Sequence, residues 1–235
     1  MRLFGFEIRK NPPEQEPVSF APPQEDDGAV IVAAGGVYGT YVDLEGSAKT
    51  EAELVTKYRD MTNHPEVDQA VDDIVNEAIV AEPEVETVKI NLDRVKAPSS
   101  VRKVLLQEFD EILRILNFKN QAYEIFKRFY VDGRLYYHVI IDEQKTNEGI
   151  QELRYVDPRK IRKIREVKKK KDQMTGATVQ QKGAEYFLYS DKGYWNAGNG
   201  NYGQNSSGTG GVKIAKDSIL HVTSGLMDVN NTVVL

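Results

Sequence analysis

The sequence predicts an α+β fold in which N-terminal helices pack with a small antiparallel β-barrel or sandwich. Over residues 49–133 apolar side chains recur mostly at helical spacing, whereas residues 134–235 hold short apolar segments separated by long polar loops. Helices that precede strands, instead of alternating with them, are typical of the α+β class. We therefore expect a flexible arm at 1–48, a helical segment at 49–133 and a β-rich segment at 134–235.

The composition is that of a globular chain without thiol chemistry. The 235 residues are 40% hydrophobic and carry a formal net charge of -5, and none of them is cysteine. This excludes disulfide bonds and thiolate metal sites and suits a reducing cytoplasm. Glu7 interrupts the apolar patch near the N-terminus, and no apolar run reaches the roughly 18 residues of a membrane span. We expect a protein that is soluble and intracellular at synthesis.

The arm is rich in proline and glycine. Five prolines lie among Glu and Gln between residues 11 and 27, and such a segment buries too little apolar surface to offset its ordering entropy. Residues 29–34 predict a short apolar strand, which the glycines at 35, 36 and 39 end. We expect this strand to order only against a neighbour.

Four helices are expected in the helical segment. The first begins at Thr50, which forms a capping-box pattern with Glu53, and its apolar face carries Leu54, Tyr58 and Met61. The others are expected at 65–81, at 99–117 with Ser99 and Ser100 as caps, and at 121–131, with a strand at 87–92 between the second and third. The helix at 99–117 carries an apolar stripe of Val101, Val104, Leu105, Phe109, Ile112, Leu113 and Leu116.

The β-rich segment is expected to contain six strands. The first, at 135–141, has apolar or aromatic side chains on both faces and should therefore be covered on both sides. The other strands are expected at 151–156, 162–168, 185–189, 212–215 and 218–223, with long polar loops at 169–182 and 194–211.

A basic run over residues 159–171 is the one strong positive patch of the sequence. Two interpretations stay open: a solvated strand and hairpin tip, or a contact with DNA phosphates or with an acidic patch on a neighbouring subunit. Base stacking is not expected, because no aromatic residues are interleaved. The run comprises Arg159, Lys160, Arg162, Lys163, Arg165, Lys168, Lys169, Lys170 and Lys171.

No motif in the sequence predicts catalysis, a cofactor or a metal. Residues 198–203 match G-x-G-x-x-G, but no helix follows them, so a loop is favoured over a nucleotide site. The histidines at 64, 138 and 221 lack metal-ligand spacing, and structural roles are expected for them. The adjacent Asp72 and Asp73 point about 100° apart on a helix and are expected on a solvated face.

Several segments resemble the portal (head-to-tail connector) proteins of T-even-type tailed phages. They occur in the family's order and are distributed over most of the chain, from residue 3 to residue 226. The similar segments are residues 3–8 (LFGFEI), 36–45 (GVYGTYVDLE), 57–61 (KYRDM), 64–70 (HPEVDQA), 72–80 (DDIVNEAIV), 132–138 (DGRLYYH), 153–161 (LRYVDPRKI) and 217–226 (DSILHVTSGL).

The resemblance implies a non-catalytic subunit of a ring, dodecameric in assembled virions, at one capsid vertex. It implies contacts with identical subunits, major capsid protein, terminase and neck proteins, passage of viral double-stranded DNA, and no small-molecule ligand. These residues would form most of the wing region, without the family's stem, clip and crown, so we expect a fragment. The protein would belong to the virion, and to the host cytoplasm during assembly. The alternative is a nucleic-acid-binding module that uses the basic run at 159–171.

Overall fold

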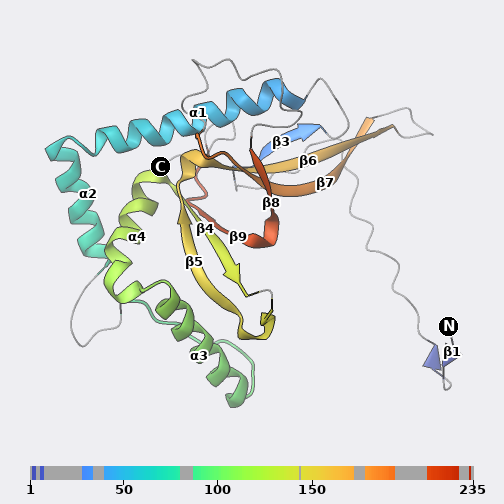
Figure 1. Cartoon of the computed structure of the whole chain (residues 1–235). Helices are drawn as coiled ribbons and strands as arrows, with labels where there is room; N and C mark the ends of the chain where they lie inside the picture. Colours follow the sequence, from blue (N-terminus) through green and yellow to red (C-terminus); the bar gives the residue numbers. More distant parts are fainter. Residues whose placement is uncertain are drawn as a thin grey trace.

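The structure is a computed structural model in which α-helices flank two β-sheets (Figure 1). It describes residues 2–3, 6–7, 28–33, 40–79, 87–142, 144–171, 178–193, 211–227 and 233. The α-helices in these residues are α1 (Thr40–Met61), α2 (Pro65–Ala78), α3 (Ser99–Ile115) and α4 (Phe118–Asp132).

The strands form two separate sheets, besides a short ladder of β1 (Arg2–Leu3) and β2 (Phe6–Glu7). One sheet has the order β5-β4-β9 and is antiparallel; its strands are β4 (Arg134–Ile141), β5 (Ile150–Val156) and β9 (Ile219–Thr223). The other has the order β3-β6-β7-β8; its strands are β3 (Val30–Ala33), β6 (Ile161–Lys171), β7 (Thr178–Tyr189) and β8 (Val212–Ala215). In this second sheet β3 pairs in parallel with β6, and the other pairs are antiparallel.

An aromatic and aliphatic core joins the two sheets. Tyr136 of β4 and Ile219 of β9 bury their side chains against Ile161 of β6 and Phe187 of β7. The Tyr136 ring meets the Phe187 ring edge-on at 6.1 Å and stacks on the His221 ring at 4.4 Å. Such contacts bury large apolar area and fix the side-chain geometry, so they set how the two sheets lie against each other.

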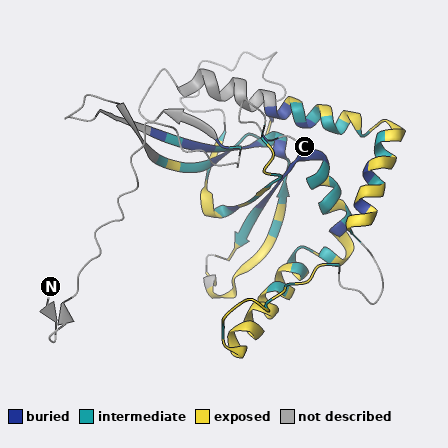
Figure 2. Ribbon diagram, turned by 180° about the vertical axis from the view of Figure 1, so that it is seen from behind, coloured by how far each residue is buried: buried dark blue, intermediate teal, exposed yellow. Residues whose placement is uncertain are grey.

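A second core joins the helices. Val71 and Val75 lie one turn apart on α2 and pack against Val131 of α4, with Tyr58 of α1 at the edge of the cluster. The outer residues of α2 stay exposed. This core holds α1, α2 and α4 together, while α3 extends away from it (Figures 1 and 2).

The expected α+β class is confirmed, with corrections to its detail. The described strands form two sheets and not a closed barrel, and the strand predicted at 29–34 is β3, which pairs in parallel with β6. Strand β8 has the expected bounds, whereas β7 begins at Thr178, inside an expected loop. The strand expected at 87–92 is wrong, because no ladder forms there. Strand β4 is buried on its first half only.

Helix α1 differs most from the expectation. It begins at Thr40, so the capping-box pattern at Thr50 lies within a continuous helix. Its buried face includes Glu51, Ala52 and Val55, whereas Met61, expected in the core, is 53% exposed. Ser99 and Ser100 likewise do not cap α3, whose N-cap residue is Pro98 without a side-chain hydrogen bond.

Candidate functional site

A buried ion cluster lies where α1 meets both sheets. The Glu51 carboxylate is 3.1 Å from an Arg134 guanidinium nitrogen and 3.0 Å from one of Arg162, and the side chains are at most 4% exposed. Arg162 also donates to the backbone oxygens of Pro158 and Ile161. Buried charges are tolerated only when paired and hydrogen-bonded, so the pairing of these residues fixes α1, β4 and β6 relative to one another.

The same cluster holds two distant parts of the chain. Arg134 donates to the backbone oxygen of Val233 at 2.6 Å. Gly28 packs against Val233 with a φ of 65°, and a Cβ at Gly28 would lie 2.6 Å from Val233 Cγ2 and 3.8 Å from a Glu51 carboxylate oxygen. Only glycine fits this left-handed backbone and this close approach. The contact between residues 28 and 233 lies beside Glu51 and is called the cluster seal below.

A second ion network joins α1, α4 and the end of β5. Arg59 Nε donates to Asp132 Oδ1 at 2.9 Å and its terminal nitrogen to Oδ2 at 2.6 Å, a bidentate pair. Arg59 also donates to Asp157 at 3.1 Å and to the Tyr155 hydroxyl at 3.3 Å. Arg159 closes the network, with a guanidinium nitrogen 2.8 Å from Asp157.

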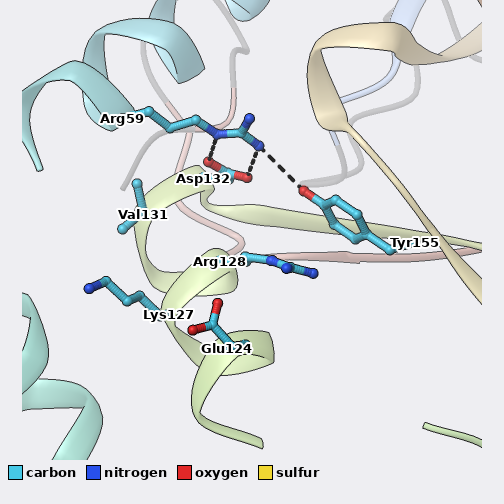
Figure 3. A pocket seen from close by; sticks show the side chains of 7 residues that line it. All are labelled: Arg59, Glu124, Lys127, Arg128, Val131, Asp132 and Tyr155. Atoms are coloured by element: carbon cyan, nitrogen blue, oxygen red, sulfur yellow. Dashed lines mark hydrogen bonds and ion pairs between the residues drawn. The ribbon is translucent and has the colours of Figure 1, made fainter. Parts of the chain in front are cut away.

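This second network lines a pocket of about 400 Å³ (Figure 3). Tyr155, Asp132 and Arg59 form one wall, and the Arg128 guanidinium lies over the Tyr155 ring at 4.8 Å from its centroid. The remaining lining residues are Glu124, Lys127 and Val131.

Burial and ion pairing shift the pKa values of Asp157 and Tyr155 in this network. Burial alone would raise the pKa of Asp157, but hydrogen bonds from the Arg159 side chain and backbone, with the Arg59 charge, lower it to about 2. Burial, with the nearby Asp132 charge, raises the pKa of Tyr155 well above its usual range. General acid–base catalysis favours a pKa close to the working pH, and both groups are moved away from neutrality.

The basic run does not form one continuous surface, which corrects the interpretation of residues 159–171 as a single patch. Arg162 and Arg165 are each 1% exposed, the first paired with Glu51 and the second with Glu185 at 2.7 Å. Buried and paired within the chain, these two arginines are not presented to a partner.

The rest of the run lies nearer the surface or along the hairpin. Arg159 and Lys160 are half-buried and paired with Asp157 and Asp191, and Lys163 is half-buried. Lys168, Lys169, Lys170 and Lys171 belong to β6, paired with residues 178–181 of β7, and their side chains lie outside the described part.

Other candidate residues occupy structural positions. Asp72 was expected on a solvated face, but it is half-buried, 2.6 Å from Lys127 Nζ and hydrogen-bonded to the Tyr123 hydroxyl; Asp73 is exposed as expected. His64 is the N-cap residue of α2, and His221 lies in β9, as expected. The G-x-G-x-x-G match at 198–203 lies outside the described residues.

Sequence reasoning missed the residues that form the two networks. The sequence analysis assigned no role to Glu51, Arg59, Asp132 or Arg134, because charge usually signals exposure. A usable signal for the Arg59 network was its place in the family-like segments, since KYRDM, DGRLYYH and LRYVDPRKI meet there. Within the described residues no group of three His, Cys, Asp or Glu could hold a metal, and no helix is long and apolar enough to cross a membrane.

Both networks tie segments of one chain together. A family model described as Bacteriophage T4-like portal protein (Gp20) matches residues 51–235, and the chain belongs to this family. It is 32% identical over 232 residues to the portal protein of Vibrio phage KVP40, covering 94% of this chain and 42% of that protein. It is 35% identical over 144 residues to the portal protein of Salmonella phage ViI, covering 61% and 26%. The family resemblance is thereby confirmed, and the chain spans less than half the length of these relatives.

Proposed function

We propose that this chain supplies part of a structural subunit in a phage portal ring, without enzymatic activity. The ring would sit at one capsid vertex, admit DNA during packaging and release it at ejection. The observation that carries the proposal is the family match over residues 51–235. The two ion networks support it, because they give a rigid subunit in which the described charged groups hold segments together.

The proposed partners follow from this role. Identical subunits would form the ring, and the family resemblance implies twelve of them in the complete protein. When one patch of a subunit binds a different patch on the next copy, the contacts generate a ring if the rotation closes. Major capsid protein, terminase and neck proteins would attach around it, and viral double-stranded DNA would pass through it. The subunit would assemble in the host cytoplasm and remain in the virion.

Light scattering combined with electron microscopy of the intact gene product tests the proposal. We expect closed rings of a uniform subunit number. A protein that stays monomeric up to high concentration, with no ring in any field, would contradict it.

A nucleic-acid-binding role is the second candidate, favoured by the β6–β7 hairpin. Four consecutive lysines, Lys168–Lys171, follow one another along β6. If each neutralises one phosphate, log K should fall with log[salt] at a slope of about -3.6, which is four contacts at about 0.9 each.

Duplex binding measured at several salt concentrations separates the two candidates. Replacing the four lysines with Gln should abolish binding, and replacing them with Arg should preserve it. If the wild type binds the duplex only weakly and the Gln variant binds it equally well, the nucleic-acid-binding role is contradicted and the ring proposal is unaffected.

A further inference from the structure

Helix α3 and the segment before it form an extension with little burial, here called the α3 arm (residues 87–115). No residue of α3 is buried, and the segment at 87–98 runs beside the helix (Figures 1 and 2). Seven of the fifteen exposed large apolar side chains in the described part of the chain lie here: Val88, Val95, Val101, Val104, Leu105, Leu106 and Ile112. Exposed apolar side chains concentrated in this way mark an interaction surface.

The half of the arm that includes the start of α3 is also basic. Between residues 87 and 106 there are five cationic side chains and one carboxylate, Asp93. No carboxylate of the described residues pairs with Lys89, Arg94, Lys96 or Lys103, and the fifth cation, Arg102, donates to the backbone oxygen of Ala97. The surface that complements this half of the arm is therefore acidic as well as partly apolar.

The outer face of α2 has this character. Glu66, Asp73 and Glu77 are exposed on the side of the helix opposite the buried Val71 and Val75. None of the three is paired with a cation in the described part of the chain, whereas the inner Asp68 and Asp72 are held by Lys127. At the edge of this face Ile74 is 39% exposed, and Met61, the last residue of α1, is 53% exposed.

We propose that the α3 arm of one copy docks on the outer face of α2 of the next copy. The inference rests on the proposed ring and names its subunit contact. The basic residues of the arm face Glu66, Asp73 and Glu77, and the apolar residues of the arm cover Ile74 and Met61. Because the two patches differ, the contact is head-to-tail, which is the kind that generates rings.

Charge reversal with rescue tests this contact in the intact gene product. Lys103→Glu and Asp73→Lys each put like charges opposite each other, and each should weaken self-association about tenfold or more in sedimentation velocity. The double variant restores opposite charges at every contact and should return to within about threefold of the wild type. Lys119→Glu makes the same charge change at an exposed position of α4 and should have no effect.

Each outcome decides between the proposals. Single variants that associate like the wild type, or a double variant that is weaker than either single one, overturn the arm–α2 contact while the ring proposal stands. A wild-type protein that never associates overturns the ring proposal itself. Loss of binding to a 20-base-pair duplex in Lys103→Glu, with unchanged self-association, assigns the arm to DNA and also overturns the contact. Because these side chains are exposed, the variants should unfold at the same temperature as the wild type. That measurement shows whether each variant is folded.

Discussion

Replacing Glu51 with Gln is expected to be one of the most damaging conservative changes in this protein. The glutamine keeps the size of the side chain, so no cavity forms, but it removes the negative charge that lies 3.1 Å from Arg134 and 3.0 Å from Arg162. Arg134 would retain its bonds to the backbone oxygens of Asp132 and Val233. Removing one partner of a buried ion cluster typically costs about 3–5 kcal/mol.

Thermal and urea unfolding of purified wild type and variant would measure this loss. For a chain of this length each kcal/mol lowers the melting temperature by about 2–4 °C, so we expect a drop of about 6–20 °C. Glu111→Gln is the matched control, because Glu111 pairs with Arg114 on the exposed surface of α3, where solvent screening leaves such a pair little effect on stability. Equal, small shifts in the two variants would refute the reasoning that burial makes the Glu51 pair valuable.

Three further predictions concern the second network and the cluster seal. Asp132→Asn removes the charge from the bidentate Arg59 pair and should destabilise by about 1.5–3 kcal/mol in urea unfolding, whereas Glu152→Gln in the exposed pair with Arg154 should have a much smaller effect. The pKa of Asp157 is lowered to about 2 in the folded state, so its stabilisation is present above about pH 4 and disappears as the pH falls toward 2. The shift corresponds to an upper limit of about 2.4 kcal/mol, which solvent screening at this half-buried site reduces, and an Asp157→Asn variant whose stability falls as steeply as wild type over this range would contradict the assignment. Gly28→Ala should lower the melting temperature of the protein more than Gly225→Ala. Both glycines have a positive φ, but only at Gly28 would a Cβ meet Val233, and nothing lies within 4 Å of one at Gly225. Equal melting temperatures of the two variants would count against the cluster seal.

Periodicity predicted the elements whose burial follows residue type. The bounds of β8 and the starts of α2 and α3 agree with the predicted ones. Helix α2 begins at Pro65, a residue favoured at the first helical position, whereas the serines predicted to cap α3 do not. Apolar spacing also located β4, β5, β6 and β9 to within a few residues.

The sequence could not predict where charge is buried or where apolar residues stay exposed. Glu51 and Arg162 are 111 positions apart, and no local pattern indicates that the two meet in the interior. The apolar stripe of α3 is helical as predicted, but its Val104 is 52% exposed, because spacing specifies a face and not what covers it. The basic run is not one patch for a similar reason: Arg162 and Arg165 lie three positions apart on β6, and each is buried against a distant carboxylate, Glu51 or Glu185.

The buried carboxylate of Glu51 also constrains the order in which the newly made chain can fold. Helix α1 leaves the ribosome long before Arg162, and at about 5–20 residues per second the intervening 111 residues take roughly 5–20 s to synthesise. Arg134 is made earlier, but the buried carboxylate has only one of its two cationic partners until Arg162 is added. The packing of α1 is therefore completed only when the β-rich segment that contains β6 has been made.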